Sequence, residues 1–328
     1  MKDGLRLIVR DEPRKEPAQP RNLRGLWIAL ADAALAAVIL VLFAWWHHGA
    51  QIYGGKGILV SPRSGPAYAM TDDFKTADNG GETGYFDFEG RFLSDAPAVT
   101  ADGDTVYYGD GSAEIAMTNY YLSSGAVRVA DIYISDISRL VTARANDFYG
   151  KGQREDPALL SQRHDALFSI TGDNYSERWG GVIMRNGVLY SRDVTEDVCV
   201  LNWDGTVDMY APEDFDLAKS VDGGAYQIWS CGPILLEYGE VTRSAQRDGS
   251  IPNRRAALGY YEPGHYCFVI MEGNVSLYQL AMNMQALGCE SAYNLYGGRL
   301  AEMNFDGQII STPQEADREC SDIIMITK

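Results

Sequence analysis

The sequence predicts an α+β domain with a mixed, mainly antiparallel sheet and packed helices, preceded by a single N-terminal transmembrane helix. Strand-like runs outnumber helical segments, and short turn motifs separate many consecutive runs, which is typical of hairpins. A hydrophobic content of 46% supports a real core. An apolar run without Lys or Arg extends from Gly25 to Trp46. These three observations together predict the architecture.

The apolar run comes first in the chain. At about 1.5 Å per residue it spans roughly 33 Å, enough for the hydrocarbon core of a bilayer. Basic residues precede it, so the positive-inside rule predicts that residues 1–24 form a cytoplasmic tail and that the C-terminal domain is extracytoplasmic. A cleaved signal peptide is the alternative reading of the same run. We therefore expect a single-pass protein of the cell membrane, anchored through residues 25–46.

The net charge of -17 is unevenly distributed along the chain. Before Gly25 there are seven Lys/Arg against four Asp/Glu, which gives +3. After Trp46 there are 21 against 40, which gives -19. Nucleic-acid binding relies on Lys and Arg that neutralise phosphates, so no nucleic-acid partner is expected.

All five cysteines follow the apolar run. An exported location permits disulfides, but an odd count leaves one thiol over or paired between chains. The sequence contains no Cys-x-x-Cys motif, and its histidines show no ligand spacing with the cysteines. We therefore predict no metal site and no cofactor, and the connectivity of any disulfides stays open.

Residues 47–112 are rich in Gly, Asp, Ser and Pro and are predicted to be a stalk or loosely ordered lead-in. Asp102 to Asp104 reads Asp-Gly-Asp, which lacks the spacing of an EF-hand loop and favours an ordinary turn. Residues 113–328 are predicted to form the folded domain.

Regular structure is expected from residue 113 onward. A Ser-Ser-Gly turn between residues 114–122 and 127–134 predicts a hairpin, and Pro157 suits the first turn of a helix that ends near His164. An acidic helical piece is expected over residues 212–221. The remaining predicted strands cover residues 166–170, 181–183, 188–190, 198–202, 207–210, 227–231, 234–237, 256–260, 266–271, 291–295, 303–310 (folded about Asp306-Gly307) and 322–326.

The stretch from Ser276 to Gly298 combines a helix, a strand and a glycine turn. Ser276 can cap a helix whose apolar residues recur at helical spacing, and Gly288 suits its left-handed C-terminal position. A short buried strand, residues 291–295, leads to Gly297-Gly298. Bare backbone at such a turn lets a ligand approach closely.

Several motifs from about Val127 to the C-terminus occur in an order that resembles the phosphodiester glycosidase family. They are Ile-Thr-Gly-Asp-Asn-Tyr (170–175), Arg-Asn-Gly-Val-Leu-Tyr (185–190), Cys-Gly-Pro-Ile-Leu (231–235), Asn-Arg-Arg-Ala-Ala-Leu-Gly (253–259), Val-Ile-Met-Glu-Gly (269–273), Ala-Tyr-Asn-Leu-Tyr-Gly-Gly (292–298) and Ser-Asp-Ile (321–323). The resemblance covers roughly 200 residues.

The resemblance implies cleavage of a sugar from a phosphodiester, with a saccharide-phosphate as the ligand. It places catalytic carboxylates at Asp173 and Glu272. It also implies that the substrate is bound by Arg255, Asn294, Gly297, Gly298 and Thr171. The guanidinium of Arg255 suits a phosphate.

The chain departs from the family pattern at the same turn. Tyr296 stands where the family motif has an aspartate, and residues 299–301 replace Gly-Ser-Ser. Three hypotheses follow: an active phosphodiester glycosidase, a saccharide- or phosphate-binding module without turnover, and a structural protein of the cell envelope.

Overall fold

The computed structural model describes residues 24–44, 58–59, 86, 88, 90–92, 96–123, 125–178, 180–311 and 319–328. The chain divides into two compact units, Met1–Ala50 and Gln51–Lys328. Residues 1–23, where the sequence predicts a cytoplasmic tail, lie outside the described residues, as do Trp45 and Trp46.

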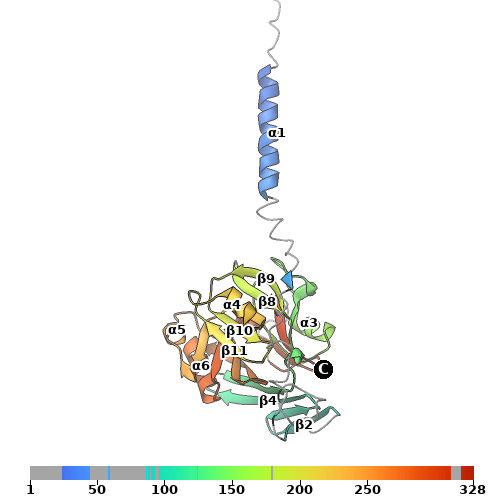
Figure 1. Ribbon diagram of the computed structural model, residues 1–328, viewed down its shortest axis with the longest axis vertical. Coiled ribbons are helices and arrows are strands. Elements are labelled where there is room, and N and C mark those ends of the chain that lie inside the picture. Colours follow the sequence, from blue (N-terminus) through green and yellow to red (C-terminus); the bar gives the residue numbers. More distant parts are fainter. Residues whose placement is uncertain are drawn as a thin grey trace, which may run out of the picture. The chain divides into compact units, whose positions relative to one another are not determined.

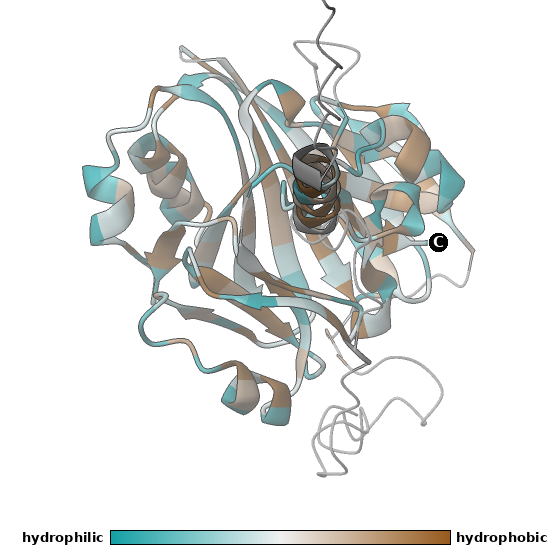
Figure 2. Ribbon diagram, turned by 90° about the horizontal axis from the view of Figure 1, so that it is seen from above, coloured by the Kyte–Doolittle hydropathy of each residue, from teal (hydrophilic) through white to brown (hydrophobic). Residues whose placement is uncertain are grey.

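The described residues of the first unit form the helix α1 (Arg24–Ala44). The helix coincides with the apolar run, and most of its coloured part in Figure 2 is brown, the colour of hydrophobic residues. In the described part of the chain, no helix is both long and apolar enough to cross a membrane. The predicted helix is therefore present, and its membrane-spanning role stays a prediction.

The described residues of the second unit form three sheets, and every strand pairing among them is antiparallel (Figure 1). The largest has nine strands in the spatial order β14 (Glu240–Val241), β13 (Ile234–Glu237), β17 (Ser291–Leu295), β15 (Asn253–Glu262), β16 (His265–Val275), β5 (Gly125–Ile134), β4 (Ala113–Leu122), β3 (Thr105–Gly109) and β2 (Ala98–Asp102).

Two smaller sheets complete the unit. The six-stranded sheet has the order β1 (Ile58–Leu59), β9 (Val188–Asp193), β8 (Gly181–Arg185), β12 (Ala225–Trp229), β10 (Val198–Asn202) and β11 (Val207–Tyr210). The five-stranded sheet has the order β19 (Gln308–Ile309), β18 (Met303–Phe305), β7 (Ala166–Thr171), β20 (Asp322–Thr327) and β6 (Leu140–Arg144).

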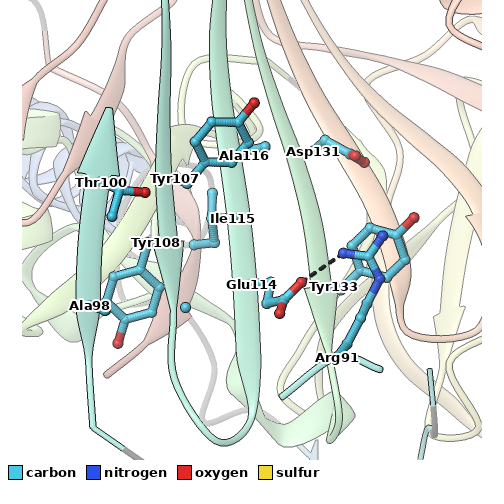
Figure 3. Close-up of a pocket in the computed structure, with 11 residues that line it drawn as sticks. Arg91, Ala98, Thr100, Tyr107, Tyr108, Glu114, Ile115, Ala116, Asp131 and Tyr133 are labelled. Carbon is cyan, nitrogen blue, oxygen red and sulfur yellow. Dashed lines mark hydrogen bonds and ion pairs between the residues drawn. The ribbon is translucent and has the colours of Figure 1, made fainter. Parts of the chain in front are cut away.

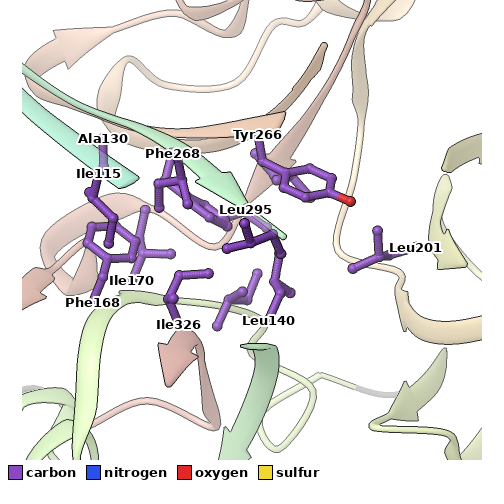
Figure 4. Close-up of a cluster of buried hydrophobic side chains, with 14 of the residues drawn as sticks. Ile115, Ala130, Leu140, Phe168, Ile170, Leu201, Tyr266, Phe268, Leu295 and Ile326 are labelled. Carbon is purple, nitrogen blue, oxygen red and sulfur yellow. The ribbon is translucent and has the colours of Figure 1, made fainter. Parts of the chain in front are cut away.

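The main hydrophobic core joins side chains from all three sheets (Figure 4). Side chains alternate between the two faces of a strand, so Phe268 and Ile270 of β16 enter this core. Cys267 and Val269 point to the opposite face, into a second cluster beneath α6. We call the first face of the nine-stranded sheet the inner face and the second the outer face.

Few helices accompany the sheets. Among the described residues, they are α3 (Pro157–Arg163), α4 (Leu217–Asp222), α5 (Arg243–Arg247), α6 (Leu277–Ala286) and the 3-10 turns η2 (Ile137–Arg139), η3 (Ala145–Asp147) and η4 (Gly298–Leu300). The predicted cap of α6 is confirmed: Ser276 Oγ accepts from the backbone N–H of Gln279, and the Gln279 side chain accepts from that of Ser276. The helix buries Leu280 and Met284 against the outer face.

The prediction of mainly antiparallel pairing with packed helices is confirmed, but there are three sheets instead of one. The structure also places β1, β2 and β3 within residues 47–112, the predicted stalk. β3 pairs with β4 and β2 pairs with β3, so both extend the nine-stranded sheet, and the Asp102–Asp104 segment is the turn between them. These Gly- and Asp-rich residues therefore form a hairpin, whose turn residues resemble those of a linker.

Candidate functional site

A buried network of two aspartates and two arginines surrounds the end of β7. The Asp173 carboxylate accepts two hydrogen bonds of 2.9 Å from Arg178 Nη2 and lies 3.2 Å from Arg185 Nη2. Arg185 Nε donates to Asp322 Oδ2 at 2.7 Å, and Asp322 Oδ1 accepts from the backbone N–H of Asp173 at 2.6 Å. Arg185, Asp173 and Asp322 have fully buried side chains. Burial raises the pKa of Asp322 although Arg185 opposes it.

This network joins β7, β8 and β20. Both carboxylate oxygens of Asp173, the residue predicted to be catalytic, are already held by arginines. A carboxylate held by two guanidinium groups and closed to solvent is typical of a structural anchor. The catalytic role of Asp173 stays a prediction.

Asn294 lies beside this network. Its Nδ2 donates to Gly232 O at 3.1 Å, while its Oδ1 has no hydrogen-bond partner among the described residues. Cys231 Sγ lies 3.7 Å from Asn294 O. Burial and the nearby Asp173 carboxylate raise the pKa of Cys231, so its thiol stays protonated and is a poor nucleophile. The structure thus brings Asn294 close to Asp173.

A second group of charged residues lies where β15 and β16 meet on the inner face. Arg254 is 1% exposed, and its Nη2 lies 3.5 Å from Glu272 Oε1. The same Glu272 oxygen lies 3.3 Å from Arg128 Nε. Glu272, another predicted catalytic residue, therefore lies between two guanidinium groups.

Arg255 points away from this group because neighbouring residues of a strand face opposite sides. Its Nε donates to Val275 O at 3.1 Å, and its Nη2 donates to Ser250 Oγ at 2.6 Å and to Ile251 O at 3.2 Å. The cation next to Glu272 is thus Arg254, one residue before the predicted phosphate ligand.

The predicted glycine turn packs directly on this region. A Cβ atom at Gly297 would lie 2.8 Å from Arg254 O, too close for any other residue without a shift of backbone. Gly298 adopts a φ of +72°, which glycine tolerates. The backbone N–H of Tyr296 donates to Gly172 O at 3.0 Å, so the turn also contacts the end of β7. Gly172 is therefore where the two charged groups adjoin.

Glu302 joins Thr171 to this site and was not predicted from the sequence. Thr171 N donates to Glu302 O at 3.0 Å. The Glu302 side chain, 8% exposed, accepts a hydrogen bond of 3.0 Å from Asn304 Nδ2. Burial raises the pKa of Glu302, and the positive charge of Arg254 only partly opposes the shift. The only clue in the sequence is its position, just past the residues that depart from the family motif.

The structure thus gathers Glu272, Thr171, Gly297 and Gly298 around Arg254 and Glu302. It places Asp173 in the adjoining network and turns Arg255 to the opposite face, while Asn294 bonds to Gly232 outside that network. Among the described residues, no group of His, Cys, Asp and Glu has the arrangement of a metal site. Two surface cavities of about 410 and 730 Å³ are lined by other residues.

The protein-family model described as "Phosphodiester glycosidase" matches residues 164–327. Among solved structures, the catalytic domain of zebrafish N-acetylglucosamine-1-phosphodiester alpha-N-acetylglucosaminidase, auto-inhibited by its pro-peptide, is similar with a TM-score of 0.52 and 18% identity. That match covers 72% of this chain and 86% of the zebrafish chain. A hypothetical protein from Synechocystis has a TM-score of 0.49 at 13% identity, over 70% of this chain and 64% of the other. No curated protein sequence matches significantly.

Proposed function

Because the chain belongs to the phosphodiester glycosidase family, we propose that its β-sheet domain binds a sugar-1-phosphodiester and releases the sugar at Arg254, Glu272 and Glu302. We call these three residues the Arg254 cluster. The observation that carries the proposal is the contrast between its two glutamates. Glu272 is paired with two arginines, whereas Glu302 is buried with a raised pKa.

Two carboxylates in unlike surroundings are what the hydrolysis of a glycosidic bond requires. In the proposed mechanism, Arg254 binds the phosphodiester charge in a site with little solvent. Glu302, whose pKa is raised by burial, donates a proton to the glycosidic oxygen as the bond to the sugar breaks. Glu272, held between Arg128 and Arg254, stabilises the positive charge that develops on the sugar ring, and water completes the hydrolysis.

The test is turnover of hexose-1-phosphate methyl esters, with and without a 2-acetamido group, followed as free sugar and methyl phosphate. We expect Glu302→Gln to lower kcat by about 10²- to 10⁴-fold, the usual contribution of a positioned acid. Arg254→Ala should lower kcat/KM. Glu237→Gln is the matched control because Glu237 is exposed at the end of β13. Equal rates for Glu302→Gln and the control would exclude Glu302 as the acid.

Binding without turnover is the second candidate function, and Tyr296 favours it. This residue is half-buried and packs against an apolar cluster that includes Leu160 and Leu300. A tyrosine there supplies no carboxylate at the position where the family motif has one. Under this alternative, the wild-type protein binds the methyl esters, loses that binding in Arg254→Ala, and releases no sugar.

We also propose that residues 25–46 anchor the domain to the cell membrane, with the domain in the extracytoplasmic space. The support comes from the apolar sequence, the basic residues before it and the helix over Arg24–Ala44. We expect the full chain to resist carbonate extraction from membranes and a chain without residues 1–50 to be soluble. Release of the full chain by carbonate would contradict the anchor.

A further inference from the structure

Half of the outer face of the nine-stranded sheet is covered by a helix. α6 contacts β13, β15, β16 and β17, and apolar side chains such as Val269 lie beneath it. The other half of this face belongs to β2, β3, β4 and β5. There, the outward side chains of Tyr107, Glu114, Asp131 and Tyr133 are aromatic or charged, whereas Val127 and Val129 of β5 belong to the apolar cluster beneath α6.

A cavity of about 410 Å³ lies on this second half (Figure 3). Its volume falls within the range of roughly 300–1,000 Å³ that is typical of small-molecule sites. Small residues line it between taller ones: Gly109 pairs with Glu114, and Ala116 pairs with Tyr107 across β3 and β4. We call it the outer groove.

Aromatic side chains stand on two sides of the outer groove. Tyr107 on β3 is 44% exposed. Opposite it, the Arg91 guanidinium lies 3.4 Å from the centroid of the Tyr133 ring, and Tyr133 in turn stacks on His265 at 3.7 Å between ring centroids. Figure 3 shows Tyr107 and the Arg91–Tyr133 pair on either side of Glu114. The Tyr133 ring is therefore held in place by His265, and the Tyr107 ring is accessible to a ligand.

Each of the two carboxylates in the outer groove has a basic side chain beside it. Arg91 Nη1 lies 2.7 Å from Glu114 Oε2, and His265 Nε2 lies 2.7 Å from Asp131 Oδ1. The carboxylates of Glu114 and Asp131 are 33% and 39% exposed, so each can accept further hydrogen bonds. Paired charges disfavour a strongly anionic ligand, whereas hydroxyl groups can donate to both carboxylates.

From these observations, we propose that the outer groove binds a neutral saccharide, one face of which stacks on Tyr107 while its hydroxyl groups donate to Glu114 and Asp131. Sugars present both an apolar C–H face and a ring of hydroxyl donors, which matches an aromatic wall beside carboxylates. The groove lies on the face opposite the Arg254 cluster, so this site does not depend on the proposed function. It would hold a part of a glycan that carries no phosphate.

The test is isothermal titration of the full-length chain with cellotriose, maltotriose and chitotriose, in a detergent without a sugar headgroup. We expect at least one of the three to bind, and Tyr107→Ala to weaken that binding roughly tenfold or more. Tyr107→Phe keeps the ring and should bind like the wild type. Ala116→Trp should abolish binding because it fills the groove.

Tyr278→Ala is the matched control, since Tyr278 on α6 is 45% exposed, close to the value for Tyr107. Arg254→Ala separates the two sites and should leave trisaccharide binding unchanged. The proposal fails if none of the three sugars binds. It also fails if Tyr107→Ala and Ala116→Trp bind like the wild type, or if binding is lost only in Arg254→Ala, which would assign the sugar to the Arg254 cluster.

Discussion

Glu272 and Glu302 carry the same functional group and differ only in their surroundings. Glu272 touches two guanidinium groups, whereas Glu302 is nearly buried and accepts from the amide of Asn304. Burial away from charged partners raises the pKa of a carboxyl group, as it does for Glu302. The proposed acid and the proposed charge stabiliser are thus distinguished by environment alone.

The raised pKa of Glu302 predicts a pH effect on stability. The folded chain binds this proton more tightly than the unfolded chain, so the stabilisation is complete below the ordinary carboxyl pKa and is lost as pH rises through the raised value. We expect the free energy of unfolding of Glu302→Gln to fall less than that of the wild type between about pH 4 and 8. Urea titrations across this range, with Glu237→Gln as the control, measure the difference. Parallel profiles for all three proteins would refute the expectation.

The positions of Cys267 and Cys289 predict that the two residues can form a disulfide. Cys267 Sγ and Cys289 Sγ lie 3.5 Å apart, and both residues are buried. A Cβ atom at Gly259 would lie 2.6 Å from either sulfur, so this glycine leaves the room in which they meet. Because a disulfide needs about 2.05 Å between sulfurs, a small shift suffices.

We expect refolding with oxidised glutathione to join Cys267 to Cys289, with loss of one hydrogen from each thiol and reduction of the glutathione disulfide. The link should stabilise the domain by about 3 kcal/mol. Peptide mapping without reductant identifies it, and Cys267→Ala should abolish the gain while Cys320→Ala keeps it. Free Cys267 and Cys289 in the refolded, oxidised sample would contradict this prediction.

The sequence predicted the region of the candidate site better than its individual residues. The glycine turn, Thr171 and Glu272 do meet around one buried cation, but that cation is Arg254. Matching motifs aligns positions along the chain, whereas strand alternation decides which of two adjacent arginines faces inward. Glu302 had no motif of its own, and its raised pKa depends on burial, which only the fold creates.

At the scale of elements, the Asp173–Arg185–Asp322 network holds three strands from two sheets together. β7 and β20 belong to the five-stranded sheet and β8 to the six-stranded sheet. Removing one partner from a buried ion pair leaves an uncompensated charge, which costs more than the pair itself contributes.

We therefore expect Arg185→Met to lower the free energy of unfolding by about 3–5 kcal/mol. Arg192→Met, on the exposed end of β9, serves as the control and should change stability little. Chemical denaturation measures both. If the first variant accumulates too little folded protein, the double variant Arg185→Met, Asp322→Asn should recover part of the yield, because Asp322 loses its ion-pair partner whereas Asp173 keeps Arg178. A stability loss for Arg185→Met no larger than that of the control would contradict the anchoring role.

Most strands were predictable because local patterns specify them. The Asn186-Gly187 turn has positive φ at both residues, as a tight hairpin requires, and β8 and β9 flank it as expected. β6 was missed because its partner β20 lies far away in the sequence, and no local turn marks the pairing. The division into three sheets depends on such distant pairings and could not be derived locally.

At the scale of the whole molecule, the second unit contains all three sheets and its own core. We expect the fragment 51–328, expressed alone, to unfold cooperatively. Its midpoint temperature should equal that of the same domain in the full chain. Circular dichroism in the same detergent measures both. A midpoint several degrees lower for the fragment would show that the domain depends on the first 50 residues.

The central position of β20 has a consequence for the timing of folding. This strand lies between β7 and β6, yet Asp322 is 149 residues beyond Asp173. During synthesis, β6 and β7 emerge before β20, so the edges that pair with β20 stay unpaired until it is made. Closing so long a loop is slow. β7 is buried along its whole length in the finished domain. A nascent chain therefore passes through a period in which apolar strand edges are open to other chains, and this period, more than the finished fold, is when the protein is most vulnerable to aggregation.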